Sequence, residues 1–347
     1  MKTNHRIVFE DSQNMRAIPS QTVDLLVTSP PYPMIEMWDG NFVKQNRVIA
    51  EFISQGKGKA AFEQMHECLD GVWDESYRVL KEGGIACINV GDATRTVDNA
   101  FMLFPNHARI STRMQHIGFT PLPVILWRKQ TNAPNKFMGS GMLPPGAYVT
   151  LEHEFILIFR KGRKREFKKD TEKLKRRESA YFWEERNVCF SDIWLDLKGI
   201  GQDLGRNSAR SRSAAYPFDL PYRLINMFSI KGDMVVDPFL GLGTTMHAAM
   251  AAGRNCMGYE VDKSMEEFIS SGMIGLHNAL NRIIKKRLEN HVAYVLQQRQ
   301  IKNFKYISKH YRFPVMTRQE TDILINPLQS VQRLAGYDFE VVYDDVL

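Results

Sequence analysis

The sequence Asp24-Leu25-Leu26-Val27-Thr28-Ser29-Pro30-Pro31-Tyr32 is a short apolar run that ends abruptly at two prolines. An apolar run of this length fits a buried strand of a parallel sheet better than a helix. Both prolines lack an N–H donor and have a fixed φ, so the turn after Ser29 is stiff and its carbonyls have few internal partners. Open α/β sheets place their ligands at such turns, beyond the carboxyl ends of parallel strands.

The turn itself offers the hydroxyl of Ser29, exposed carbonyls and the ring of Tyr32. A planar amino compound could donate hydrogen bonds to the hydroxyl and to a carbonyl while it stacks on the ring. A proline-rich turn that only closes a strand would have the same sequence. The turn alone is compatible with both interpretations, and the rest of the chain distinguishes between them.

Strands and helices alternate along the chain. Apolar runs predict further strands over residues 6–10, 85–90, 124–127, 154–159, 234–237 and 256–261. Helical spacing predicts helices over residues 60–80, 105–117, 220–229 and 244–252, and from Ser264 onward. Residues 33–59 and 131–148 show no clear periodicity, and we expect long loops there. This alternation predicts an α/β domain with a mostly parallel sheet.

The composition is that of an ordinary soluble protein, with 347 residues, 44% of them apolar and 24% charged. No stretch approaches the roughly 18 uninterrupted apolar residues of a membrane span. The N-terminal residues lack the apolar region of a signal peptide, so we expect a cytoplasmic protein. The four cysteines are isolated from one another, which predicts neither a disulfide framework nor a metal site.

The net charge of +7 is concentrated in one segment. Residues 160–177 contain eleven Lys or Arg and three Asp or Glu, so this segment carries an excess of +8 and the rest of the chain a balance of −1. A basic patch of this kind is typical of a protein that binds a polyanion such as nucleic acid. The alternative is a charged surface that is only solvated.

A second chemical feature is the glycine-rich segment Asp237–Thr245, which follows a predicted strand and opens a predicted helix. Glycines at such a turn let a ligand approach the backbone. The segment lacks the third glycine of a GxGxxG dinucleotide motif. It is not a phosphate-binding loop either, since no lysine precedes Thr244. Glu260, at the end of the next strand, suits the two hydroxyls of a ribose. The combination indicates a ligand that carries a nucleoside but no pyrophosphate.

With these two motifs the chain resembles the S-adenosylmethionine-dependent DNA amino-methyltransferases of the β group, in which the catalytic motif precedes the cofactor motif. Ser29-Pro30-Pro31-Tyr32 matches the catalytic signature (Asp/Asn/Ser)-Pro-Pro-(Tyr/Phe/Trp). Asp237–Thr245 matches the cofactor signature Asp-Pro-Phe-x-Gly-x-Gly-Thr-Thr. The resemblance covers about residues 5–265. Two separate motifs in the right order make it specific.

The resemblance implies a Rossmann-like fold: a mostly parallel, seven-stranded sheet with helices on both faces, in circularly permuted motif order. It divides the chain into a catalytic half (1–159), a basic target-recognition region (160–213), a cofactor-binding half (214–265) and a mainly helical C-terminal extension (266–347). It assigns catalysis to Ser29, Pro30, Pro31 and Tyr32. It assigns S-adenosylmethionine binding to Asp11, Pro217, Phe218, Asp237, Pro238, Phe239, Gly241, Gly243, Thr244, Thr245 and Glu260.

The implied reaction is direct, in-line methyl transfer to the amino group of a base flipped out of duplex DNA. Cytosine C5 methylation is excluded, because it needs a Pro-Cys pair that this chain lacks. Within the family, serine at the first motif position accompanies mostly N4 of cytosine, and aspartate mostly N6 of adenine. Ser29 therefore favours N4-cytosine, with N6-adenine as the alternative. A non-catalytic binding module and an RNA or protein-amide methyltransferase are less favoured.

The partner predicted from the basic region is double-stranded DNA, contacted at phosphates and at base edges. The residues expected to contact it are Arg160, Lys161, Arg163, Lys164, Arg165, Lys168, Lys169, Arg206, Asn207, Arg210 and Arg212. The resemblance also implies a bacterial or archaeal modification system with a cognate restriction endonuclease as a second partner. The enzyme would act as a monomer or homodimer.

Overall fold

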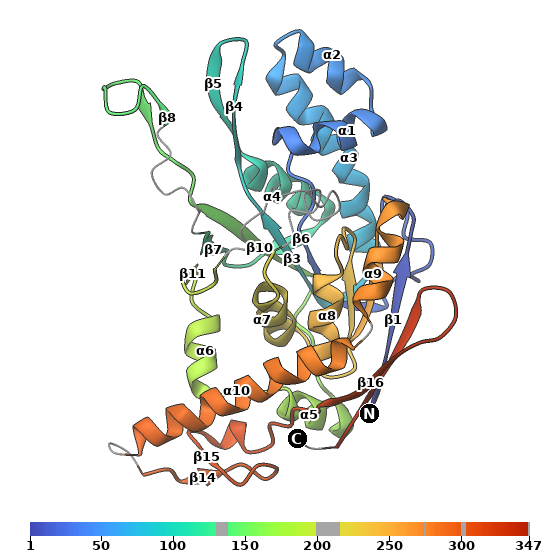
Figure 1. Cartoon of the computed structure of the whole chain (residues 1–347), viewed down its shortest axis with the longest axis vertical. Helices are drawn as coiled ribbons and strands as arrows, with labels where there is room; N and C mark the ends of the chain where they lie inside the picture. Colours follow the sequence, from blue (N-terminus) through green and yellow to red (C-terminus); the bar gives the residue numbers. More distant parts are fainter. Residues whose placement is uncertain (130–137, 199–215, 274, 300–302, 346–347) are drawn as a thin grey trace.

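Parallel strands form the centre of a large sheet in the computed structural model, which describes residues 1–129, 138–198, 216–273, 275–299 and 303–345. Within these ranges the sheet has eleven strands in the order β11-β7-β10-β3-β2-β12-β13-β1-β17-β16, with β6 paired to β10 (Figure 1). The strands are β1 (Lys2–Val8), β2 (Val23–Thr28), β3 (Leu80–Val90), β6 (Phe119–Pro121), β7 (Ile125–Arg128), β10 (His153–Lys161), β11 (Ile193–Trp194), β12 (Met234–Asp237), β13 (Asn255–Tyr259), β16 (Leu328–Arg333) and β17 (Asp338–Tyr343).

The pairings of β3, β2, β12, β13 and β1 are all parallel, and β10 and β17 are the strands that run against the common direction. β2 is buried along its whole length, as its apolar run predicts. Leu25 and Val27 face one core cluster, and Leu26 faces the other. Such alternation arises because side chains of a strand point to opposite faces, both of which are covered here.

Helices cover the two faces of the sheet. α3 (Gly58–Val79) and α4 (Asn106–Ile117) bury apolar side chains such as Trp73 and Met114 in the cluster on one face. α7 (Asp219–Phe228), α8 (Thr244–Ala251), α9 (Glu266–Gly272) and α10 (Leu276–Gln298) contribute to the cluster on the other. The mostly parallel α/β architecture predicted from the sequence is confirmed.

Two predictions, one about a segment and one about the sheet, were wrong. Residues 33–59 are not a loop: they form η1 (Glu36–Trp38), α1 (Asp39–Gln45) and α2 (Val48–Ser54), anchored by fully buried Phe42 and Ile49. Helices of seven residues are too short to show a clear period in a polar sequence. The sheet has eleven strands and not seven, partly because the C-terminal extension adds the hairpin β16–β17 to the edge strand β1.

The remaining short elements lie at the ends of the sheet. The hairpin β4 (Ala93–Val97)–β5 (Ala100–Phe104) rises beyond one end, next to α1 and α2, and the hairpin β8 (Met138–Gly139)–β9 (Ala147–Tyr148) rises on its other side (Figure 1). The other end carries α5 (Asp170–Glu178), α6 (Trp183–Cys189), β14 (Tyr306–Ile307), β15 (Pro314–Val315) and the turn η3 (Arg318–Glu320). The turn η2 (Lys263–Met265) precedes α9.

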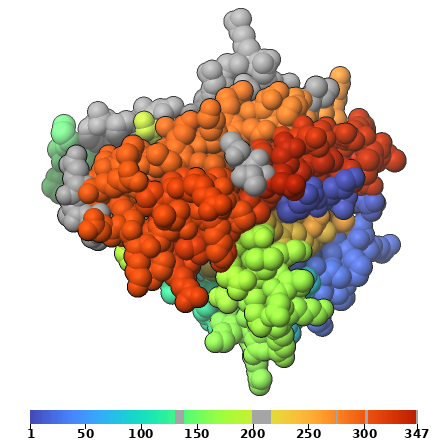
Figure 2. Space-filling model, turned by 90° about the horizontal axis from the view of Figure 1, so that it is seen from below, coloured from blue at the N-terminus to red at the C-terminus, as the bar shows by residue number. Residues whose placement is uncertain are grey.

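The basic segment lies at the amino end of the central strands. β10 is antiparallel to β3, so it ends where β2 and β3 begin. The chain after Lys161 therefore continues at that end of the sheet. Seen from that end, α5 stands out beside the C-terminal extension (Figure 2). The turn at Ser29, by contrast, lies at the carboxyl end of β2.

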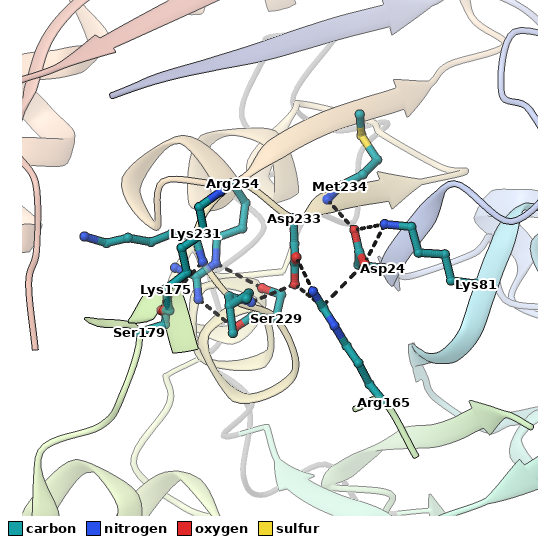
Figure 3. A network of polar contacts seen from close by, with 12 residues as sticks. Asp24, Lys81, Arg165, Lys175, Ser179, Ser229, Lys231, Asp233, Met234 and Arg254 are labelled. Carbon is teal, nitrogen blue, oxygen red and sulfur yellow. Dashed lines mark hydrogen bonds and ion pairs between the residues drawn. The ribbon is translucent and has the colours of Figure 1, made fainter. Parts of the chain in front are cut away.

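Part of the basic segment holds the fold together. The Arg165 guanidinium donates to both oxygens of Asp233, at 2.6 and 3.0 Å, and lies 3.4 Å from Asp24 (Figure 3). Lys81 donates to Asp24 at 2.8 Å, so both buried carboxylates are compensated. Lys161 is also buried, and its ammonium donates to the backbone carbonyls of Tyr77 and Leu80.

Replacing Arg165 with alanine would leave Asp233 and Asp24 buried with fewer partners. We expect the free energy of unfolding to fall by about 2 kcal/mol, because an unpaired buried carboxylate is costly and Arg165 is only partly buried. Chemical denaturation would measure the loss. Lys168→Ala is the control: Lys168 is 84% exposed and should change stability by less than about 0.5 kcal/mol. Equal stability of the two variants would contradict the structural role of Arg165.

Candidate active site

The two sequence motifs meet because β2 and β12 are neighbours in the sheet. The register pairs Leu25 with Val235 and Leu26 with Val236, so both strands end at the same edge. Thr28 Oγ1 donates to Asp237 Oδ1 at 2.6 Å, which ties the last residue of one strand to the last residue of the other. The Ser29–Tyr32 turn and the glycine-rich turn therefore start side by side.

Asp237 is the centre of a buried group of hydrogen bonds. Besides Thr28, its carboxylate accepts from the hydroxyls of Thr245 and Tyr216 and from the amide of Phe239. Burial raises the pKa of Asp237, and these donors oppose the rise by stabilising the carboxylate. Both oxygens are engaged by the chain itself. Asp237 therefore shapes the turn instead of presenting a free carboxylate to a ligand, which is a narrower role than the motif predicts.

The glycine-rich turn has the backbone conformation that its glycines allow. Gly241 has a φ of +52° and Gly243 a φ of +82°, both in the left-handed region that other residues rarely adopt. α8 begins directly afterwards at Thr244, with its buried neighbour Thr245 bonded to Asp237. A loop of this shape exposes backbone rather than side chains, and it ends at the amino end of a helix.

Glu260 lies against the same turn, at the end of β13. Its Oε2 accepts from the amide of Gly241 at 2.9 Å and its Oε1 from the amide of Asp262 at 2.8 Å. Burial raises the pKa of Glu260, whereas the two amides lower it. The structure thus brings together Asp237, Gly241, Gly243 and Glu260, as the sequence predicts.

The other predicted cofactor residues surround this group. Asp11 is exposed, follows β1 and accepts a hydrogen bond from the amide of Gln13 at 2.9 Å. β1 pairs with β13, so Asp11 belongs to the same edge of the sheet. Pro217 is buried, and Phe218 is half-buried and stacks on Tyr222 with ring centroids 5.4 Å apart. Pro238 and Phe239 continue from Asp237 into the turn.

The Ser29–Tyr32 turn is joined to a polar network that the sequence analysis did not predict. The Tyr32 hydroxyl lies 3.0 Å from Ser29 Oγ and donates to Glu154 Oε2 at 3.0 Å. Asn89 Nδ2 donates to the Tyr32 hydroxyl at 2.9 Å and to Glu154 Oε2 at 2.6 Å. Lys129 Nζ donates to Glu154 Oε1 at 2.8 Å. One available signal was that Asn89 and Glu154 are polar residues within otherwise apolar strand sequences.

The Tyr32 side chain is buried, and its neighbours fix the position of its ring. It is 9% exposed, and a Cβ on Gly91 would lie 3.1 Å from its ring, so the glycine provides the space. Burial, followed by the charge of Glu154, raises the pKa of Tyr32 well above its ordinary value. The hydroxyl therefore stays protonated and available as a donor. The prediction that the ring stacks on a base stays a prediction.

The described residues among those predicted to bind DNA do not line this edge. Arg160, Lys161, Arg163, Lys164, Arg165, Lys168 and Lys169 lie in or after the carboxyl end of β10, at the opposite end of the central strands. The charged groups of Lys161 and Arg165 are used inside the fold, which corrects their assignment as phosphate contacts. Arg206, Asn207, Arg210 and Arg212 lie outside the described residues.

Two kinds of feature are absent from the described ranges. No group of three or more His, Cys, Asp or Glu side chains there could hold a metal ion. No helix there has both the length and the apolar character needed to cross a membrane.

Comparison with known proteins agrees with this geometry. A family model described as DNA methylase (N6_N4_Mtase) matches residues 23–271 and so spans both motifs. The chain belongs to this DNA methylase family. The methylase is 49% identical over 347 residues to the type II methyltransferase M.MthZI of Methanothermobacter thermautotrophicus, covering 100% of this chain and 97% of that protein. It is 50% identical over 279 residues to the type II methyltransferase M.MjaI of Methanocaldococcus jannaschii, covering 77% and 90%.

Among solved structures, the methylase is similar to TTHA0409 from Thermus thermophilus in complex with S-adenosyl-L-methionine. The TM-score is 0.60 and the sequence identity 29%, and the match covers 80% of this chain and 96% of that one. The predicted resemblance to amino-methyltransferases is thereby confirmed at the level of the family.

Asp237 connects both motifs, so its removal should affect stability. In Asp237→Ala the hydroxyls of Thr28, Thr245 and Tyr216 lose their shared acceptor in a buried site. We expect the free energy of unfolding to fall by about 3 kcal/mol, as for a buried hydrogen-bonded carboxylate. Thermal or chemical denaturation without ligand would measure it. Asp192→Ala, at an exposed position before β11, is the comparison, and an equal loss in both variants would contradict the structural role of Asp237.

Proposed function

We propose that this methylase transfers a methyl group from S-adenosylmethionine to the N4 amino group of cytosine in double-stranded DNA. The observation that carries the proposal is Ser29 at the carboxyl end of β2, beside the glycine-rich turn after β12. A hydroxyl at this motif position favours N4-cytosine, and N6-adenine is the second candidate. The relatives' description as type II methyltransferases supports a modification system with a cognate endonuclease.

The turn at residues 238–243 fits S-adenosylmethionine. Two glycines with positive φ leave the backbone open to a ligand, and the Glu260 carboxylate at its edge can accept from ribose hydroxyls. No lysine stands before Thr244 to bind a phosphate, which matches a cofactor without one. We assign cofactor binding to this turn, to Glu260 and to Asp11, with Pro217 and Phe218 alongside. The bound cofactor supplies an electrophilic methyl group on a sulfonium.

The catalytic turn acts by positioning. The Ser29 hydroxyl and the Pro30 carbonyl accept the two N–H bonds of the target amino group, which orients its nitrogen and favours a more tetrahedral geometry. Tyr32 forms the aromatic wall of the site. A base within a duplex cannot reach this turn, so it has to leave the stack, at a cost of a few kcal/mol. The hairpins β4–β5 and β8–β9 rise at this edge, where the duplex would approach (Figure 1).

Cytosine C5 methylation is a poor alternative for the same site. That reaction needs a reactive thiolate, and no cysteine follows a proline in this chain. Cys87 and Cys256 are buried, and burial raises the pKa of both thiols, so they stay protonated and inert. The proposed enzyme acts on DNA in the cytoplasm of a bacterium or archaeon, as a monomer or homodimer.

The proposal predicts methylation that depends on Ser29. Expression of the protein in a host without modification systems should place N4-methylcytosine at one sequence motif, as read by sequencing that distinguishes methylated bases. Ser29→Ala should lower the methylation rate by about 100-fold, because it removes one acceptor from the amino group. Ser330→Ala, on β16 away from the site, should leave it unchanged. Methyladenine in place of methylcytosine would select the second candidate, and no methylated base would refute the proposal.

A separate prediction concerns the cofactor. Glu260→Gln should weaken S-adenosylmethionine binding by about 10- to 100-fold, since the neutral amide accepts weaker hydrogen bonds from the ribose and no longer satisfies both backbone amides. Calorimetry with the purified protein would measure the dissociation constant. Glu289→Gln, exposed on α10, is the matched control. Unchanged affinity in Glu260→Gln would contradict the assignment of Glu260.

A further inference from the structure

A chain of hydrogen bonds leads from the catalytic turn to a buried carboxylate. Ser29 Oγ lies 3.0 Å from the Tyr32 hydroxyl, and that hydroxyl lies 3.0 Å from Glu154 Oε2. Glu154 is only 8% exposed, at the start of β10, and comes from a part of the chain 122 residues away from Tyr32. A buried carboxylate beside a catalytic turn calls for a physical explanation, because burial of a charge is costly unless it is compensated.

Lys129 and Asn89 supply the compensation. Lys129 Nζ donates to one oxygen of Glu154 at 2.8 Å, and Asn89 Nδ2 donates to the other at 2.6 Å. Of the side chains bonded to Glu154 in the described part of the chain, Lys129 and Tyr32 are titratable. These contacts give both oxygens of Glu154 hydrogen-bond donors and fix its position.

The direction of each hydrogen bond in the chain is determined. Tyr32 has one hydroxyl hydrogen, and it points to Glu154, which is an acceptor. The hydrogen between Ser29 and Tyr32 must therefore belong to Ser29. Asn89 cannot reverse this order, because its Nδ2 also donates to the Tyr32 oxygen. Asn89 Nδ2 also donates a long hydrogen bond to Ser29 Oγ, at 3.5 Å, which leaves the second lone pair of Ser29 to accept a hydrogen bond from a substrate.

The proposed reaction releases a proton from the amino group, and this proton needs an acceptor. As the amino nitrogen forms its bond to the methyl carbon with its lone pair, the electron pair of the carbon–sulfur bond stays on sulfur, and the nitrogen becomes cationic. One N–H proton must then leave. A serine hydroxyl alone is a weak proton acceptor, whereas a carboxylate has an ordinary pKa of about 4 and is far more basic.

We propose that the Ser29–Tyr32–Glu154 chain removes this proton and that Glu154 is its final acceptor. Ser29 Oγ takes the N–H proton and passes its own hydrogen to Tyr32, which passes its own to Glu154. The carboxylate becomes a carboxylic acid, and each hydroxyl ends as it began, so atoms and charge balance. Glu154 does not touch the base and acts as a positioning residue through Tyr32. The inference rests on the proposed function but holds for either target base.

The test is single-turnover methyl transfer by the full-length protein on duplex DNA that contains the recognition site. Glu154→Gln keeps the size of the side chain but not its basicity, and should slow transfer by about 100-fold with unchanged affinity for S-adenosylmethionine. Tyr32→Phe keeps the ring, interrupts the chain, and should slow transfer by a similar factor. Glu154→Ala leaves space for a small acid, and added formate should restore much of its rate.

Glu152→Gln is the matched control: Glu152 lies two residues away and pairs with Arg128 at the surface. It should retain the full rate. A full rate in Glu154→Gln would overturn the proposal, as would a slow Glu154→Ala that formate does not restore, since that result indicates a structural role. If the unmodified protein methylates no DNA, the proposed function fails instead, so the two failures are distinguishable.

Discussion

The hydrogen bond between Thr28 and Asp237 is the contact on which the site depends. It joins residues 209 positions apart in the chain, and it does so at the ends of two neighbouring parallel strands. The Ser29–Tyr32 turn follows Thr28, and the glycine-rich turn follows Asp237. Because the carboxyl ends of parallel strands share one edge, the order in which the two halves occur along the chain does not change the site they build.

The Asp237 carboxylate also fixes other segments next to the two strand ends. Asp237 is buried, and burial by itself favours the protonated acid. Donors from Thr28, Thr245, Tyr216 and the Phe239 amide oppose that tendency, and each comes from a different place around the turn. A single buried acceptor thus fixes β2, the start of α8 and the segment before α7 relative to one another. The glycines can then open the backbone without loosening the site.

The sequence predicts the central strands and the turns after them better than it predicts the segments around them. The buried run at 24–28 and the turn at 237–245 were assigned correctly, because apolar runs and glycine spacing are local signals. α1 and α2 were missed because Phe42 and Ile49 are isolated apolar residues in a polar context. Glu154 and Lys129 were missed because their role depends on β10 and β7 pairing next to β3, which no local pattern reports.

The basic segment shows a different limit. Its charge excess is real, but charge alone does not say where a segment lies or what its cations contact. Lys161 proved to be buried and donates to backbone carbonyls, and the partly buried Arg165 pairs with Asp233. The exposed members of α5, such as Lys173 and Arg176, stand at the amino end of the strands.

At the edge of the sheet that carries the Ser29–Tyr32 turn, two described cations are paired with carboxylates. Lys129 pairs with Glu154 and Arg95 with Asp39, so these charges are already neutralised. In the proposed reaction the turn holds a neutral amino group, which needs acceptors in fixed positions more than it needs net charge. Ser29, with its hydrogen directed to Tyr32 and one lone pair left for the substrate, would meet that need, and the paired side chains around it fix its position.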